Sequence, residues 1–321
     1  MKLILQNHSS YPRDLPSPRP ERAHLDEILH EQAQSGIDVA TDGQLDWPDP
    51  VSHVMGKLDG VRIAGDQRYF DTDSRYHQPV ISGSLRRRGP MLRDRFTVAR
   101  LASPLPVKPV LPGPYTLARL CVNQSGVYRD LPALAHALSD ILAAEVTELI
   151  DAGATLFQVD EPAILFHPED IRLLRELLEP IWQVRGSALM VVATYFGDAA
   201  PLYAQLNSLP ADILALDFTC SPTLADEITA TGASKILALG LIDGRNPRVE
   251  DPSAVARQVD LVLKRYVLDT VHLLPSCGLA YLRRSVARAK LEVLATVRDL
   301  MSDRGIDSAS AGVGHSEVRS G

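Results

Sequence analysis

The feature that most limits the fold of this chain is a regular alternation of short apolar runs with longer amphipathic runs. The short runs are rich in Val, Ile and Leu, as strands buried on both faces are, and the longer runs have apolar residues at helical spacing. Eight such units predict an α/β protein, a closed parallel (β/α)8 barrel of the TIM-barrel type. The eight predicted strands are Leu3–His8, Ile37–Ala40, Val107–Leu111, Thr155–Val159, Leu189–Ala193, Ile213–Leu216, Ile236–Leu239 and Val271–Leu274. The longest predicted helices include Leu131–Asp151 and Pro252–Leu268.

One stretch interrupts this alternation. Between about residues 44 and 106 the sequence contains several prolines and two alternating runs, Gly60–Tyr69 and Pro79–Leu85, which favour a β-hairpin. We therefore predict a hairpin-containing insertion after the second strand. In this prediction residues 1–303 form a single barrel, and residues 304–321, with little apolar content, form a disordered tail.

The composition excludes several classes of protein. With 45% hydrophobic residues over 321 positions, the chain can bury a large core without disulfides or a structural metal. A formal net charge of -7 argues against nucleic-acid binding, because there is no excess of Lys and Arg to neutralise phosphates. The three cysteines are too scattered for a disulfide framework, and we find neither a leader nor an apolar run of about 18 residues. We therefore expect a cytoplasmic protein that does not bind membranes.

Polar side chains follow most of the predicted strands. In a parallel barrel these positions meet at the C-terminal rim, where active sites are found. The clearest case is Asp160-Glu161-Pro162, directly after the fourth strand. Taken alone, this triplet is equally well explained by capping of the helix that follows, so its interpretation depends on the other strand ends. Those ends carry Ser10, Asp46, Asp217 with Cys220, Asp243 with Arg245, and Cys277.

Six motifs in a fixed order give the chain a family resemblance. They are Ser9-Ser-Tyr-Pro-Arg13, Thr41-Asp-Gly43 with Asp49-Pro-Val51, Leu111-Pro-Gly-Pro-Tyr-Thr116, Gln158-Val-Asp-Glu-Pro-Ala163, Gly240-Leu-Ile-Asp243 and Leu274-Pro-Ser-Cys-Gly-Leu279. In this order they resemble the C-terminal catalytic barrel of cobalamin-independent methionine synthase, in the superfamily that also contains uroporphyrinogen decarboxylase. The resemblance runs from about Leu3 to Leu300 and implies a single-barrel, core form of that enzyme.

The resemblance implies a methyltransferase of methionine biosynthesis that acts on the thiol of homocysteine or a similar thiol amino acid. In the family a zinc ion produces the thiolate, since a free thiol with a pKa of about 8.5 is mostly protonated at neutral pH. By this resemblance Cys277 and Asp217 stand at two ligand positions, whereas Val192-Ala193-Thr194 replaces the family's His-x-Cys motif. Cys220 offers a second thiolate, so the implied zinc site consists of Cys277, Asp217 and Cys220.

A substrate pocket is also implied by the resemblance. Ser10, Asp46 and Asp160 correspond to the family residues that hold the amino-acid backbone of the substrate, and Glu161 adjoins them. This assignment is chemically sound, because carboxylates pair with an α-ammonium and a hydroxyl donates to an α-carboxylate.

At the reacting end, the candidate catalytic residues are Cys277, Asp243 and Arg245. Arg245 stands where the family has a proton-relay His, and a guanidinium cannot act as a base. The implied methyl donor is a methylfolate or, for a core form, a methylcorrinoid.

Two hypotheses remain open from the sequence. The first is an S-methyltransferase that acts on a thiol amino acid. The second is a metal-free paralogue that keeps the barrel and the amino-acid pocket. It would serve as an amino-acid-binding or regulatory protein, or catalyse a different reaction of the uroporphyrinogen decarboxylase type. Bound zinc and homocysteine-dependent methionine formation would distinguish the first from the second.

Overall fold

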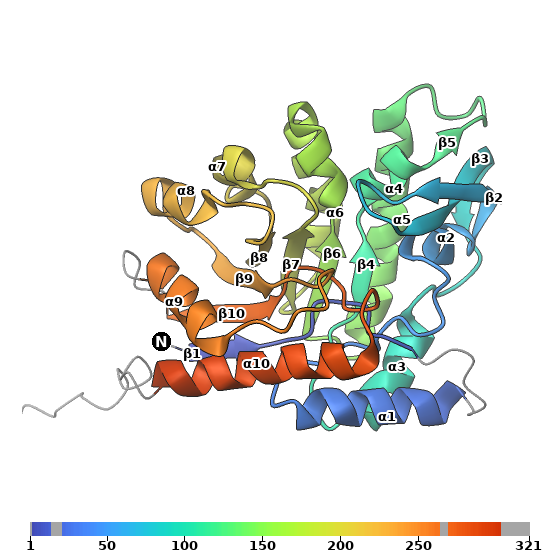
Figure 1. Cartoon of the computed structure of the whole chain (residues 1–321). Helices are drawn as coiled ribbons and strands as arrows, with labels where there is room; N and C mark the ends of the chain where they lie inside the picture. Colours follow the sequence, from blue (N-terminus) through green and yellow to red (C-terminus); the bar gives the residue numbers. More distant parts are fainter. Residues whose placement is uncertain (1, 14–20, 264–268, 303–321) are drawn as a thin grey trace, which may run out of the picture.

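Seven parallel strands form the central sheet of the computed structural model, which describes residues 2–13, 21–263 and 269–302. The β-rich runs of the sequence become these strands, and helical chain packs on the outside of the sheet (Figure 1). In spatial order the strands are β1 (Lys2–Leu5), β10 (Thr270–Pro275), β9 (Ile236–Ile242), β8 (Ile213–Asp217), β7 (Leu189–Thr194), β6 (Leu156–Asp160) and β4 (Val110–Pro112).

The eighth position is occupied by the segment 37–41, which is not a regular strand. Isolated parallel bridges join Val39 to Gln6, next to β1, and Ala40 to Val107, just before β4. Backbone hydrogen bonds accompany both bridges. The segment therefore lies between the two edge strands of the sheet. The predicted (β/α)8 architecture is confirmed, with its second strand reduced to a few bridge residues.

Helices cover the outer face of the sheet, as the alternation predicts. The helix predicted at Leu131–Asp151 is observed with the same bounds, and the Asp130 carboxylate caps it by accepting a hydrogen bond from the Ala133 amide at 2.9 Å. The helices of the α/β units are α1 (Glu21–Gln34), α4 (Pro114–Leu120), α5 (Leu131–Asp151), α6 (Ile171–Val184), α7 (Tyr203–Leu206), α8 (Leu224–Thr231), α9 (Pro252–Leu263) and α10 (Arg284–Ser302), with short 3₁₀ turns η1 (Pro162–Phe166), η2 (Pro168–Asp170) and η3 (Ala200–Leu202).

Some of the predicted bounds fall outside the described residues. The predicted helix 252–268 is described only as far as Leu263, and the predicted domain end at residue 303 and the tail 304–321 lie beyond the described ranges. Within those ranges, none of the helices combines the length and the apolar character that crossing a membrane requires.

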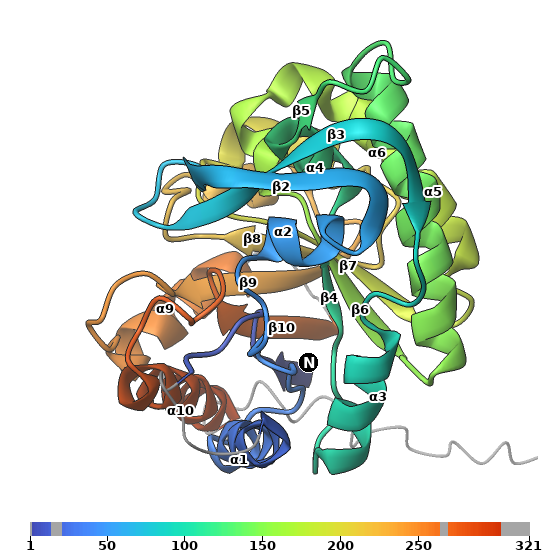
Figure 2. The same cartoon turned by 90° about the vertical axis from the view of Figure 1, so that its right-hand side faces the viewer.

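The predicted hairpin is present after the second strand position. β2 (Leu58–Arg68) and β3 (Arg75–Arg87) pair antiparallel, and the short strand β5 (Val122–Asn123) adds to β3 in parallel. Gly60 is required in β2, because its φ is +79° and an added Cβ would lie 2.5 Å from the Ser84 carbonyl oxygen. Figures 1 and 2 show the hairpin as a long curved ribbon outside the ring of strands.

Two helices and one buried carboxylate attach this insertion to the barrel. α2 (Pro50–Met55) precedes the hairpin and α3 (Arg93–Ala102) follows it. Glu145 of α5 is fully buried and accepts hydrogen bonds from the Arg87 guanidinium and the Met91 amide, both at 2.8 Å. Because a buried charge without partners is costly, these bonds fix the end of the hairpin against α5.

The inside of the ring of strands has an apolar and a polar side. On the polar side Gln6, Lys108 and Gln158 are fully buried, and the Lys108 ammonium donates a hydrogen bond to each of the two glutamines. The apolar side is filled mainly by small and branched residues of β6 to β10: Leu156, Val191, Ala193, Ile213, Ala215, Ala238 and Leu274. The polar side leads along β6 to the C-terminal end of the strand, where the candidate site lies.

Candidate active site

The ends of four strands bring reactive side chains to one rim of the sheet. β6 ends at Asp160 and β8 at Asp217, while Asp243 directly follows β9 and Cys277 comes two residues after β10. The four strands are parallel, so these ends lie on the same side of the fold. The candidate active site therefore lies at this end of the barrel.

Asp160 is a buried carboxylate at the end of β6. Its Oδ1 accepts a hydrogen bond from Gln158 Nε2 at 2.7 Å, and its Oδ2 accepts one from the Tyr195 hydroxyl at 3.1 Å. Burial raises the pKa of this carboxyl to about 6, although both hydrogen bonds and the charge of Lys108 oppose the rise. At neutral pH the group is mostly ionised and can pair with a cation. Its hydrogen bonds go to side chains, not to a helix terminus, which removes the capping explanation for Asp160.

Glu161 has a different environment, although it is the next residue. Its carboxylate accepts hydrogen bonds from the amides of Tyr115 and Thr116, at 3.0 and 2.8 Å, and from the Thr116 hydroxyl at 2.6 Å. These groups belong to the first turn of α4, and a Cβ added at Gly113 would lie 2.1 Å from Glu161 Oε1. Burial raises the pKa of Glu161 to about 7. The carboxylate therefore anchors α4, and a contact between Glu161 and substrate stays a prediction without geometric support.

Arg245 links the ends of β8 and β9. Its Nη2 donates a hydrogen bond to the Cys220 sulfur at 2.9 Å, and its backbone amide donates to Asp243 Oδ1 at 2.9 Å. The guanidinium carbon also lies 5.5 Å from the centre of the Phe196 ring. A fixed cation is thus held beside a sulfur atom and a carboxylate.

Cys277 is buried in the same part of the rim. Its thiol donates to the Gly278 carbonyl at 3.6 Å, and a Cβ added at Gly244 would lie 2.7 Å from its sulfur. Burial raises the pKa of the Cys277 thiol, and the charge of Asp217 adds to the rise. Cys277 is therefore a protonated thiol at neutral pH.

The zinc site implied by the sequence does not fit this arrangement. Both oxygens of Asp217 already accept hydrogen bonds, Oδ1 from Thr219 and the Cys220 amide and Oδ2 from the Phe196 amide. The Cys220 sulfur faces a guanidinium, which would repel a second cation. Val192-Ala193-Thr194 supplies no imidazole or thiolate. Across residues 2–13, 21–263 and 269–302, no group of three or more His, Cys, Asp and Glu side chains is arranged to hold a metal ion.

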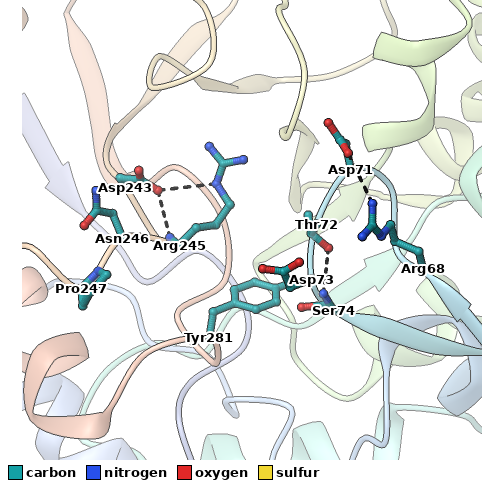
Figure 3. Close-up of a pocket in the computed structure, with 10 residues that line it drawn as sticks. All are labelled: Arg68, Asp71, Thr72, Asp73, Ser74, Asp243, Arg245, Asn246, Pro247 and Tyr281. Atoms are coloured by element: carbon teal, nitrogen blue, oxygen red, sulfur yellow. Dashed lines mark hydrogen bonds and ion pairs between the residues drawn. The ribbon is translucent and has the colours of Figure 1, made fainter.

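Two open cavities lie at the rim and share Ser74 and Tyr281. The larger, of about 800 Å³, lies between the tip of the β2–β3 hairpin and the loop after β9, and Figure 3 shows its charged lining. The smaller has about 400 Å³ and contains Ser10 in its wall. Asp243 and Arg245 line the larger cavity, so the predicted Ser10 position and the predicted catalytic pair lie in different cavities. Asp160 lines neither cavity; it is buried and hydrogen-bonded to Tyr195 and Gln158.

Aromatic side chains close the rim over Asp160. Tyr69 and Phe70, at the hairpin tip, pack against Phe196 with ring centres 6.1 and 6.4 Å away. Phe196 also packs against Tyr195, with ring centres 4.7 Å apart, and the Tyr195 hydroxyl donates to Asp160. Phe70 and Phe196 both have a positive φ, 52° and 71°, which bulky residues rarely adopt, so tertiary contacts hold the tip in place.

Asp46 lies apart from the rest of the predicted set. It is at the surface, 3.9 Å from Arg95 Nε, and neither cavity includes it in its lining. Asp49 lines the smaller cavity instead, with its carboxylate bound to Ser52 and His77. A role for Asp46 in substrate binding thus stays a prediction.

Tyr69 and Tyr281 were not predicted as site residues, but the structure places both in the walls of the cavities. A signal was available for Tyr69. Its hairpin run ends in two aromatic residues immediately before the polar turn Asp71-Thr72-Asp73, where exposed aromatic side chains are unusual.

Comparison with known proteins agrees with the fold and the motifs. The solved structure of a B12-independent methionine synthase from a Shewanella species, in complex with selenomethionine, has a TM-score of 0.81 at 22% identity, over 94% of this chain and 98% of that one. A methyltransferase from Methanosarcina mazei has a TM-score of 0.67 at 13% identity, over 93% and 94% of the two chains. At these identities the likeness concerns the fold.

Sequence relatives and a family model extend the likeness beyond the fold. A methionine synthase of Sulfurisphaera tokodaii is 28% identical over 292 residues, 88% of this chain and 84% of that protein. One of Saccharolobus solfataricus is 29% identical over 268 residues, covering 82% and 79%. Residues 14–299 match the family model described as "Cobalamin-independent synthase, Catalytic domain". The expectation of a methyltransferase of the methionine synthase type is thereby confirmed at the level of the family. Since the match takes in most of the sequence, the chain belongs to the cobalamin-independent synthase family.

Proposed function

We propose that this protein transfers a methyl group to the thiol of homocysteine or a closely similar thiol amino acid. The observation that carries the proposal is Asp160, a carboxylate inside the rim that is ionised near neutral pH and therefore suited to an α-ammonium. Ser10, in the wall of the smaller cavity, is the proposed donor to the α-carboxylate. The selenomethionine bound to the Shewanella protein supports an amino acid of this class.

The proposed reacting end lies at Arg245 and Asp243. A guanidinium 2.9 Å from one sulfur, that of Cys220, is a suitable neighbour for the sulfur of a substrate thiolate. In the proposed step Asp243 accepts the thiol proton, the substrate sulfur forms a bond to the methyl carbon, and the bond from that carbon to the donor nitrogen breaks. The electron pair of the broken bond stays on the nitrogen, which takes up a proton. Because the residues present do not fit zinc, the proposal contains no metal step.

The methyl donor that we propose is a methylfolate. The larger cavity, with about 800 Å³, is in the size range of small-molecule sites, and its wall combines Tyr281 with Arg68 and Arg245. The Tyr281 ring suits stacking of a flat ring, and the wall also contains Asp71, Asp73 and Asp243, whose carboxylates suit the amino and amide N–H groups of a pterin. A corrinoid donor draws no support from a family named for its independence of cobalamin. A cytoplasmic location stays a prediction.

A second candidate function is amino-acid binding without methyl transfer. The misfit of the zinc donor set favours it, because both oxygens of Asp217 already accept hydrogen bonds and Cys220 is engaged by Arg245. In this alternative Asp160 still binds the α-ammonium of an amino acid, and Arg245 and Asp243 take no part in a reaction.

The test is a methyl-transfer assay with purified protein, L-homocysteine and 5-methyltetrahydrofolate, as the monoglutamate and the triglutamate, with methionine measured by mass spectrometry. We expect methionine to form, and Arg245→Met to abolish its formation while L-methionine still binds. Amino-acid binding without methionine formation from either donor would replace the proposal by the second candidate. Absence of both activities would reject both functions.

A further inference from the structure

Lys108 is a fully buried lysine for which the chemistry proposed above has no use. It lies inside the ring of strands, and its Nζ donates hydrogen bonds to Gln6 Oε1 at 2.7 Å and to Gln158 Oε1 at 2.5 Å. Lys290 is equally buried, but its ammonium is paired with both oxygens of Glu250 at 2.8 Å. A buried ammonium normally requires such a counter-charge. Lys108 instead donates hydrogen bonds to two neutral side-chain amides.

The nearest counter-charge is the Asp160 carboxylate, which is joined to Lys108 through the side-chain amide of Gln158. Gln158 accepts from Lys108 through Oε1, which leaves its Nε2 to donate to Asp160 Oδ1 at 2.7 Å. An amide side chain has one accepting and one donating end. The ammonium therefore fixes Gln158 in the orientation that presents a donor to Asp160.

The other arm of the network is neutral. Gln6 accepts from Lys108, so its Nε2 donates to His272 Nδ1, and burial together with the charge of Lys108 lowers the pKa of His272 to about 4. The only anion in contact with this network within the described residues is Asp160. Burial lowers the pKa of Lys108 to about 7, and the charge of Asp160 opposes that decrease.

We propose that Lys108 is a positioning residue for Asp160, and that its buried ammonium, acting through the amide of Gln158, keeps that carboxylate oriented and ionised for the substrate ammonium. This inference rests on the proposed role of Asp160. Without Lys108, Gln158 is free to turn over and present its oxygen to Asp160, an arrangement that favours the protonated carboxyl.

Other ionisable groups also face Asp160, and most of them stay neutral. Burial raises the pKa of the tyrosines around it, so they stay neutral between pH 5 and 8, and burial lowers the pKa of His8, which favours its neutral form. Glu161 adjoins Asp160 along the chain and affects every variant equally. The groups are His8 after β1, Tyr69 from the hairpin, Tyr195 after β7, Tyr281 after β10, Glu161 after β6 and Lys108 before β4.

The experiment compares wild type with Lys108→Met and Gln158→Leu. The Asp160 carboxyl is titrated by 13C NMR in the ligand-free protein, with Asp160→Asn to assign the signal, and the affinity for L-homocysteine and L-methionine is measured from pH 5 to 8. We expect both variants to raise the Asp160 midpoint by about one pH unit. Such a rise lowers the ionised fraction about fivefold at pH 6 and less than twofold at pH 8, and the affinity should follow it.

Lys290→Met is the matched control, because it removes a buried ammonium that has no connection to Asp160. A purely structural Lys108 would behave like this control, with lower stability and an unmoved Asp160 midpoint, and that result would overturn the inference. If Lys108→Met does not fold, Lys108→Gln, which also lacks the ammonium but keeps a polar side chain and leaves Gln158 in place, decides in the same way. If the midpoint moves but neither amino acid binds wild type, the inference about Asp160 stands and the proposed function fails.

Discussion

Replacing Asp160 by Asn separates binding from stability. In wild type, burial raises the pKa of Asp160 from 3.8 to about 6, so the ionised form costs the folded state about 3 kcal/mol above pH 6. Stability therefore falls as pH rises from about 4 to 6, and Asn removes this loss. Asn also gives up one of two hydrogen bonds, about 1 kcal/mol, and leaves Lys108 without its anion. These effects oppose each other, and we expect the free energy of unfolding to stay within about 2 kcal/mol of wild type.

Binding should change much more. An α-ammonium that loses its carboxylate partner loses about 2 to 3 kcal/mol, which corresponds to a dissociation constant roughly 30 to 140 times larger. Calorimetry with L-methionine and urea unfolding on the same samples give the two quantities. Asp212→Asn is the control, since Asp212 accepts from the Met190 amide at the opposite end of the sheet. Unchanged affinity, or a loss of stability as large as the loss of binding energy, would refute the role of Asp160.

Two further predictions concern the neighbours of this carboxylate. Glu161→Ala leaves the buried amides of Tyr115 and Thr116 without their acceptor and should lower the free energy of unfolding by at least about 3 kcal/mol in urea titrations, so unchanged stability would contradict its anchoring role. Zinc measured by mass spectrometry should be well below one equivalent per chain and the same in Cys277→Ser, whereas one equivalent that is lost in that variant would show that the metal site forms after all.

Most of the fold could be predicted because continuous apolar runs are typical of strands buried on both faces. The second strand was the exception. Its partner segment has proline at position 106, which faces the segment 37–41 and has no N–H to donate to it. Pairing at this position is therefore restricted to isolated bridges. A strand length predicted from apolar residues alone does not take the missing N–H of a partner's proline into account.

The site was predictable only in part, because some of its contacts join residues that are far apart in the sequence. Strand ends locate the rim, so Asp160, Asp217, Asp243 and Cys277 could be named from the sequence. Lys108 could not, because it is one charged residue in an apolar run, and its partners lie 102 and 50 positions away. Contacts of that range depend on the closed ring, which no local pattern describes.

The adjacent carboxylates at the end of β6 show how one dipeptide carries two functions. Successive side chains of a strand point to opposite faces. Asp160 continues the inward row of Gln158 and meets the polar interior, whereas Glu161 points outward and meets the first turn of α4. A single inserted or deleted residue in β6 would exchange the two environments, placing a helix anchor in the pocket and a binding group under α4. The Asp-Glu-Pro motif is therefore constrained on both faces of the strand at once.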